Sequence, residues 1–177
     1  VQIKGNCQYI NGYYYHNCCI EKLAQENTQL KEKYLKEAVL EYSKRLSRFV
    51  KLEIIEIPDC KIPENASKSQ ELSVLEKEGD MILSKIKPNS HLICMCIEGK
   101  QLSSTEIADE IESISMTKSH ITFVIGGSLG IADKVKNMAD LKLSFGKITL
   151  PHQLMRVILL EQVFRGFKII NNETYHK

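Results

Sequence analysis

A parallel α/β sheet is the fold class that the sequence predicts, and three observations favour it. From Leu30 onward, amphipathic helical patterns alternate with short apolar runs. The runs have the length of strands and are bounded by turn residues, and helix-capping residues stand where a helical pattern begins. Strands that alternate with helices are typical of a parallel sheet, which places its ligands at the carboxyl ends of the strands.

The first three elements are a helix, a strand and a second helix. Residues 30–49, "LKEKYLKEAVLEYSKRLSRF", place apolar side chains at three- and four-residue steps, which predicts an amphipathic helix. Residues 50–59, "VKLEIIEIPD", predict a strand that a proline ends. Asn65 and Ser67 can cap the next helix, which we expect over residues 71–86.

Two strands and a capped helix follow. Residues 91–99, "HLICMCIEG", have the length and composition of a buried strand. Ser103 and Glu106 form a capping box ahead of a helix at residues 107–115. Residues 121–127, "ITFVIGG", predict the next strand, which ends in a glycine pair.

A short helix, a strand and a long helix complete the pattern. The short helix is expected over residues 131–139, and the strand over residues 141–145, "LKLSF". The long helix is expected over residues 151–167. Pro151 suits its first turn because the missing N–H would have no intrahelical partner there, and Thr149 lies close enough to cap it.

The long helix carries four polar residues in an otherwise apolar stretch. At about 100° per residue, His152 and Arg156 project to one side and Glu161 and Arg165 to roughly the opposite side. A helix that is apolar on several sides is buried on several sides, so these polar groups need partners. They are either paired with one another at i,i+4 spacing or directed at a ligand.

Residues 1–29 lack this regularity. An Asn-Gly turn signal lies between aromatic residues in "YINGYYYHNCC", which is compatible with a hairpin, but nothing in the segment alternates cleanly. His16, Cys18 and Cys19 lack the Cys-x2-Cys spacing of a structural zinc site, so we expect no metal.

Length, charge and cysteine usage place the chain in a broad class. The 177 residues suit one domain, and a formal net charge of +2 does not by itself indicate nucleic-acid binding. Cys94 and Cys96 lie in an apolar run, where free thiols behave as small hydrophobic groups. With no export signal and no run of roughly 20 apolar residues, we expect a cytoplasmic protein with no membrane partner.

Common catalytic fingerprints are missing. "GGSLG" lacks the spacing of a dinucleotide-binding loop, and no Gly-Lys-Ser/Thr loop or serine nucleophile elbow is present. Gly126 and Gly127 end a predicted strand, where the missing side chains allow a ligand or another backbone segment to approach closely, or form a tight turn.

Four segments resemble a known family. "CIEGKQLSS", "FVIGGSLG", "SFGKITLPHQLMRVILLEQVFRGFKI" and the terminal "YHK" occur in the same order in SPOUT-class methyltransferases that methylate N3 of a pseudouridine in bacterial large-subunit ribosomal RNA. The resemblance covers residues 30–177, which we take as the methyltransferase domain.

The resemblance implies a parallel-sheet SPOUT fold with a deep C-terminal trefoil knot, an exception to the usual avoidance of threaded chains. It also implies a homodimer, and binding of S-adenosylmethionine in a pocket of three loops held mostly by backbone groups. We expect the interface of the homodimer to include the long helix, because a helix that is apolar on opposite sides needs two partners to cover it. The loops correspond to the residues Met95, Gly126, Phe145, Gly146, Lys147, Ile148, Thr149 and Leu150.

The resemblance also places residues at the acceptor base. N3 of a pseudouridine carries a proton and becomes a good nucleophile only once that proton is lost. His176 or His152 is expected to take the proton, Arg165 to stabilise the uracil oxygens, and Tyr175 to stack on the base or bond to it. The expected partner is large-subunit ribosomal RNA or the ribosome.

The N-terminal segment departs from the family. There, a short strand ending in Gly-Lys stands just before the first helix, whereas "AQENTQ" stands there in this chain. Either residues near "CCIEKLA" take the place of that strand, or the sheet is one strand short. Two other functions stay open: a SPOUT methyltransferase that acts on transfer RNA, and a non-catalytic protein that binds RNA or ribosomes.

Overall fold

The computed structural model describes residues 7–10, 13–16, 18–26, 32–58, 60, 62 and 65–174, with side chains described from Glu32 onward. The strands of the described part are β1 (Cys7–Ile10), β2 (Tyr13–His16), β3 (Cys18–Glu26), β4 (Val50–Pro58), β5 (Ser90–Gln101), β6 (His120–Ile125) and β7 (Leu141–Ser144). Its helices are α1 (Lys33–Leu46), α2 (Lys68–Lys85), α3 (Ser104–Thr117), α4 (Asp133–Met138) and α5 (His152–Ile170).

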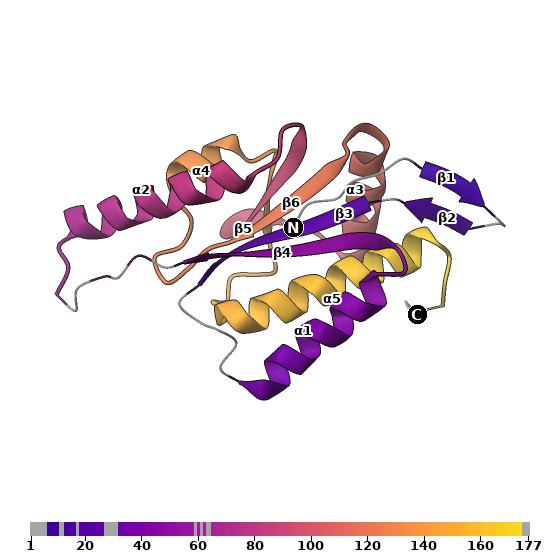
Figure 1. Ribbon diagram of the computed structural model, residues 1–177, viewed down its shortest axis with the longest axis horizontal. Coiled ribbons are helices and arrows are strands. Elements are labelled where there is room, and N and C mark those ends of the chain that lie inside the picture. Colours follow the sequence, from indigo (N-terminus) through magenta and orange to yellow (C-terminus); the bar gives the residue numbers. More distant parts are fainter. Residues whose placement is uncertain are drawn as a thin grey trace.

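The main sheet contains β4, β3, β6, β5 and β7 in that order, and every neighbouring pair is parallel (Figure 1). This confirms the predicted α/β class. Each crossover between the strands of the sheet carries a helix, as parallel connections require. The trefoil knot stays a prediction.

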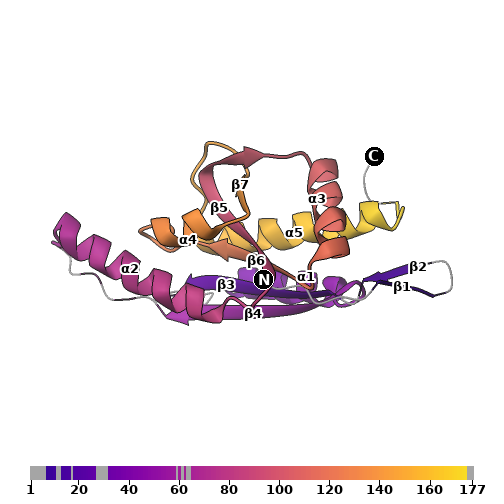
Figure 2. The same ribbon diagram turned by 90° about the horizontal axis from the view of Figure 1, so that it is seen from above.

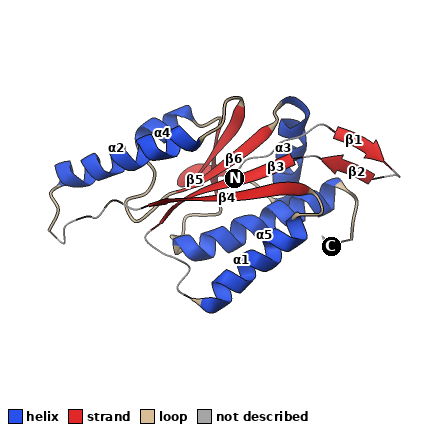
Figure 3. Cartoon of the chain, viewed as in Figure 1, coloured by secondary structure: helices blue, strands red, loops and turns tan. Residues whose placement is uncertain are grey.

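The sheet separates two apolar cores, because alternate residues of a strand face opposite sides. On β5, Ile93 and Met95 join the core that α1, α3 and α5 cover. Leu92 and Cys94 join the core on the other face, beneath α2 and α4. Figure 3 shows α2 and α4 together on their side of the molecule, apart from α1 and α5.

The predicted helix caps are largely confirmed. Ser67 and Ser103 each accept a bond from the N–H three residues on, and Gln70 and Glu106 return the bond, so both helices start with capping boxes. The expectation for Thr149 was wrong. Pro151 is the N-cap of α5, and no side chain among the described residues caps that end. The first helical residue is therefore His152, one position later than the proline signal suggested.

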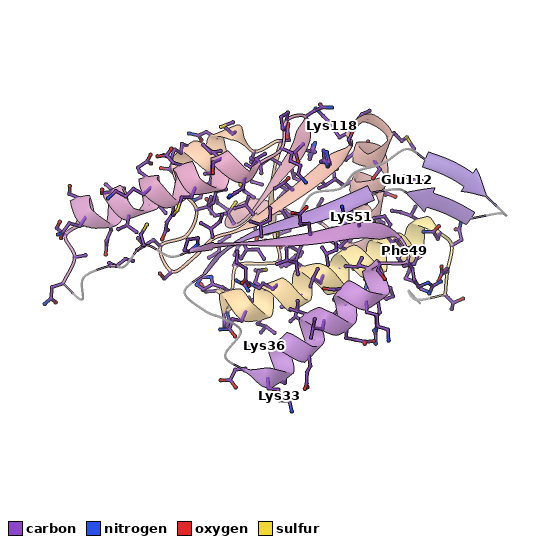
Figure 4. The ribbon with its side chains drawn as sticks, in the orientation of Figure 1. Lys33, Lys36, Phe49, Lys51, Glu112 and Lys118 are labelled. Atoms are coloured by element: carbon purple, nitrogen blue, oxygen red, sulfur yellow. The ribbon has the colours of Figure 1, made fainter. Side chains whose placement is uncertain are left out.

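Helix α5 lies at the centre of its core. It packs against the sheet, α1 and α3, and Leu159 and Val163 are each about 1% exposed. Near its carboxyl end the ring of Phe167 stacks on that of Phe49, with centroids 5.7 Å apart. Phe49, labelled in Figure 4, lies between α1 and β4. We expected α5 to need a second chain because it is apolar on opposite sides. Most of that apolar surface is instead buried within this chain.

Strand β3 resolves the two alternatives for the first strand of the sheet. It pairs with β4 from Cys18 opposite Val50 to Glu26 opposite Pro58, and with β6 on its other side. Residues near "CCIEKLA" therefore occupy an inner position. The antiparallel pair of β1 and β2 agrees with the hairpin alternative, and it lies beyond the end of the main sheet (Figure 2).

None of the helices in the described part of the chain has both the length and the apolar character needed to cross a bilayer.

Candidate functional site

A cavity of about 200 Å³ lies where β5, β6 and β7 stop pairing with their neighbours, at the carboxyl side of the sheet. Its walls come from β5, the turn after β6, helix α4, the loop between β7 and α5, and the start of α5. Its lining residues are Met95, Cys96, Ile97, Glu98, Ile125, Gly126, Gly127, Gly130, Ile131, Lys136, Leu143, Ser144, Phe145, Gly146, Ile148, Thr149, Leu150, His152 and Met155. The position is the one that a parallel sheet predicts for a ligand.

The structure brings most of the expected site residues together. Those in the cavity wall are Met95, Gly126, Phe145, Gly146, Ile148, Thr149, Leu150 and His152. Lys147 belongs to the same loop but does not line the cavity, and its side chain is exposed. Arg165 does not line the cavity either. Tyr175 and His176 lie outside the described residues, as do the side chains of His16, Cys18 and Cys19.

The glycine pair after β6 closes a tight turn. A Cβ atom added to Gly126 would lie 2.6 Å from the backbone carbon of Gly130 and 2.9 Å from a side-chain carbon of Ile131. Gly130 donates its N–H to the carbonyl of Gly127 at 3.0 Å and has a φ of +88°. The sequence left open whether a ligand or another backbone segment approaches Gly126. In the structure it is the backbone of Gly130 that approaches. The turn that results forms a wall of the cavity.

The loop between β7 and α5 is shaped by Gly146 and Ser144. Gly146 has a φ of +123°, a conformation that L side chains rarely adopt. The buried Ser144 hydroxyl donates to the Gly146 carbonyl at 3.0 Å and accepts the Gly146 N–H at 3.2 Å. This reciprocal pair fixes the bend at the start of the loop that lines the cavity.

Two charged side chains face each other in the cavity wall. Lys136 of α4 donates from Nζ to Oε1 of Glu98 on β5 at 2.7 Å. The hydrogen bond from Lys136 lowers the pKa of Glu98, and the same bond raises the pKa of Lys136. Sequence reasoning missed this pair because its members are 38 residues apart and no motif links them.

The cysteines next to the cavity are poor nucleophiles. Burial raises the pKa of the Cys94 thiol to about 12, with a smaller contribution from Cys96. Burial also raises the pKa of Cys96, and the nearby Glu98 carboxylate adds to it. Both thiols are therefore protonated near neutral pH, whereas the thiolate is the reactive form.

The sequence allowed the polar residues of α5 either to pair with one another or to face a ligand, and the structure shows examples of both pairing and exposure to the cavity. Arg165 contacts Oε1 of Glu161 through Nη2 at 2.7 Å and Nε at 3.0 Å, so these residues form an i,i+4 pair. Arg156, with a side chain 2% exposed, donates to Glu56 of β4 at 3.0 Å. His152 differs from both, since it lies in the cavity wall. The arrangement offers a largely apolar slot with one imidazole and one ion pair at its surface.

Comparisons with known proteins agree with this arrangement. Residues 26–176 match the family described as "Predicted SPOUT methyltransferase". The protein named "Ribosomal RNA large subunit methyltransferase H 1" of Clostridium perfringens (strain SM101 / Type A) is 59% identical over 150 residues, which cover 84% of this chain and 94% of that protein. Proteins named "Ribosomal RNA large subunit methyltransferase H" from Clostridium tetani and Enterococcus faecalis are 53% and 52% identical over the same shares. The chain therefore belongs to the SPOUT methyltransferase family.

Proposed function

We propose that the protein transfers a methyl group from S-adenosylmethionine to N3 of a pseudouridine in large-subunit ribosomal RNA, as a cytoplasmic homodimer. One observation carries the proposal. Three segments that the family resemblance assigns to the donor, around Met95, around Gly126 and over residues 145–150, form the walls of a single cavity. The names of the relatives from C. perfringens, C. tetani and E. faecalis support the ribosomal RNA substrate.

The residues present suit the donor. The adenine and ribose of the donor require an apolar slot whose backbone groups can form hydrogen bonds. The cavity supplies the apolar side chains of Ile131, Leu143 and Leu150 and the backbone of the loop that contains Gly146. When bound, a sulfonium donor supplies an electrophilic methyl carbon and departs as a neutral thioether, so little acid catalysis is needed on that side.

The acceptor side needs a base. The N3–H of a pseudouridine must be lost before the nitrogen attacks, and a neutral imidazole within reach can accept that proton. His152 lies at the start of α5, in the cavity wall, and this position supports it as one candidate for that base. Tyr175 and His176 are the other candidates, from the terminal segment that resembles the base-binding part of the family. Arg165 keeps its proposed role at the uracil oxygens, with Glu161 as its present partner.

The homodimer has support at the mouth of the cavity. Ile97 and Ile148 line the cavity and are 51% and 68% exposed, and Leu154 in the first turn of α5 is 38% exposed. Neighbouring apolar side chains at a site rim are typical of a surface that a second protein covers. A cavity of about 200 Å³ is also smaller than pockets that enclose a ligand of this size, so a second chain would complete it. We expect twice the mass of the chain in solution.

The test combines donor binding with methyl transfer. We expect calorimetry to detect S-adenosylmethionine binding in the presence of a chelator, because the cavity holds its ligand with backbone and apolar groups. We also expect the protein to methylate large-subunit RNA, with the product located by mass spectrometry. Methylation of transfer RNA instead would favour the alternative substrate, and ribosome affinity without donor binding would favour a non-catalytic protein.

Deletion of residues 175–177 sharpens this test. We expect it to abolish methyl transfer and leave donor affinity within about twofold, because a three-residue end adds little to a core but can bring a phenol and an imidazole to an acceptor base. The parent chain is the control. Full methylation by the shortened chain would remove Tyr175 and His176 from the site.

A further inference from the structure

The donor cavity contains an ion pair that its proposed function does not yet use. Among the described lining residues, Glu98 is the one carboxylate and Lys136 the one ammonium. Most of the others are apolar or glycine. A carboxylate and an ammonium placed together in such a wall suit a ligand group that itself carries both charges.

The pair is tied together and still accessible. The 2.7 Å contact joins Nζ of Lys136 to Oε1 of Glu98, while the Glu98 side chain remains 56% exposed and that of Lys136 22% exposed. An ammonium has three donors and a carboxylate has two acceptor oxygens, so each group can bind a second partner without giving up the first.

The pair also lies at a fixed place in the fold. Glu98 belongs to the part of β5 beyond Met95, after the register with β7 shifts between Met95 and Lys100. Gly99 allows this, since a Cβ there would lie 2.7 Å from the backbone of Leu143. Lys136 belongs to the short helix α4, whose Val135 is fully buried and anchors the helix in the core. Two separate elements thus hold opposite charges at one edge of the cavity.

We propose that Lys136 and Glu98 bind the amino-acid end of the methyl donor, with the Lys136 ammonium on its α-carboxylate and the Glu98 carboxylate on its α-ammonium. The inference rests on the proposed function, because it assumes the donor is S-adenosylmethionine. Four alternating charges then form a closed set in which each attracts two neighbours. The two residues are positioning residues, since they contact the donor away from the methyl carbon.

The helix α4 provides a matched control. Lys134, two positions from Lys136, pairs with Glu76 and Asp80 of α2 at 3.0 and 2.6 Å. It has a similar exposure, and it does not line the cavity. Lys134→Gln removes a comparable ion pair from the same helix but leaves the cavity unchanged.

The experiment measures the affinity of three ligands by calorimetry for the parent chain, Lys136→Gln, Glu98→Gln and Lys134→Gln. The ligands are S-adenosylmethionine, its decarboxylated form, which keeps the ammonium, and methylthioadenosine, which lacks the whole amino-acid end. A charge-assisted hydrogen bond is worth about tenfold or more in affinity.

The proposal predicts a crossed pattern. Lys136→Gln should weaken S-adenosylmethionine about tenfold without weakening the decarboxylated ligand, because only the first has the carboxylate. Glu98→Gln should weaken binding of the decarboxylated ligand about tenfold or more, since the ammonium of the ligand would then face only the ammonium of Lys136. Methylthioadenosine should bind all four proteins equally, which also shows that each variant is folded. Lys134→Gln should match the parent chain for every ligand.

Other patterns overturn the proposal. Equal losses for all three ligands, or no loss for any, would show that the ion pair only joins α4 to β5. A parent chain that binds methylthioadenosine and S-adenosylmethionine equally would place the amino-acid end away from the pair. A parent chain that binds no S-adenosylmethionine would refute the proposed function itself, and the inference with it.

Discussion

His91, at the start of β5, is a partly buried imidazole that links the stability of the fold to pH. Its side chain is 17% exposed, and Nδ1 lies 3.9 Å from Oδ2 of Asp140. Its pKa is lowered from the usual 6.5, chiefly by burial, with an opposing effect of Asp140 and Glu110 and a reinforcing one of Lys118. The neutral imidazole is therefore the form that the folded state favours.

The pH dependence follows from the direction of that shift. Since the unfolded chain titrates near 6.5 and the folded chain lower, the unfolded state binds more protons between the two pKa values. The contribution of His91 to stability is thus complete above the unfolded pKa and falls as the pH drops below it. We expect urea unfolding to show a larger loss of free energy from pH 7.5 to pH 5.5 for the parent chain than for His91→Gln. Equal losses would show that His91 does not carry this dependence.

The residues of the site differ in how far the sequence could reveal them. Gly126 and the loop from Phe145 to Leu150 could be found, because they lie in continuous motifs that follow strands. The pair of Glu98 and Lys136 could not, since its members are 38 residues apart and meet only in the folded chain. The same holds outside the cavity for Glu56 and Arg156, which are 100 residues apart. The pair of Glu161 and Arg165 on α5 could be predicted from helix geometry alone, because its members are four residues apart.

The chain packs closely against several glycines, and Gly126 and Gly166 show how the neighbours of a glycine decide what a side chain would cost. A Cβ at Gly126 would meet the backbone of Gly130 at 2.6 Å, and backbone atoms can give way only if the turn moves. A Cβ at Gly166, where α5 crosses α3, would meet the Cδ1 atom of Ile111 at 3.3 Å. That atom is the end of a flexible side chain and can shift by a few tenths of an ångström.

We expect alanine to have unequal effects at these two positions. Gly126→Ala should destabilise the fold by about 1–3 kcal/mol, as overpacking does, and should weaken donor binding because the turn forms a cavity wall. Gly166→Ala should be close to neutral, because about 1 kcal/mol of helix propensity offsets the crowding against Ile111. Urea unfolding of both variants checks this. A neutral Gly126→Ala, or a severe loss for Gly166→Ala, would contradict it.

The order of helices and strands along the chain could be predicted better than the pairing of the strands in the sheet. Helix caps such as Ser67 and Ser103 act within four residues, so these caps could be predicted and were confirmed. The helices themselves begin at Lys68 and Ser104, three residues before the predicted starts at residues 71 and 107. Pro151 marked the start of α5 one residue early, because proline is compatible with both the N-cap and the first helical position. Which strands neighbour one another depends on contacts across the whole chain, and no local pattern encodes them.

The whole molecule depends on β3, whose place in the sheet follows only from such long-range pairing. Residues 18–26 lie between β4 and β6 and bond to both, whereas β1 and β2 pair with each other in a separate two-stranded sheet. Removing β3 would leave facing rows of backbone N–H and C=O groups on β4 and β6 without partners in the middle of the sheet. Removing β1 and β2 would leave the five-stranded sheet complete.

Two shortened chains test this division. A chain that begins at residue 17 should keep its circular dichroism spectrum and a cooperative thermal transition, with a melting temperature within a few degrees of the parent, because its sheet keeps all five strands. A chain that begins at residue 28 should lose the cooperative transition, because unpaired inner backbone groups cost about 1–3 kcal/mol each against a total stability of about 5–15 kcal/mol. Donor binding should follow folding in both, since Gly126 follows β6, the strand next to the gap, and Met95 lies on β5, the neighbour of β6. Cooperative melting and intact donor binding in the shorter chain would show that β4 and β6 close the sheet without β3.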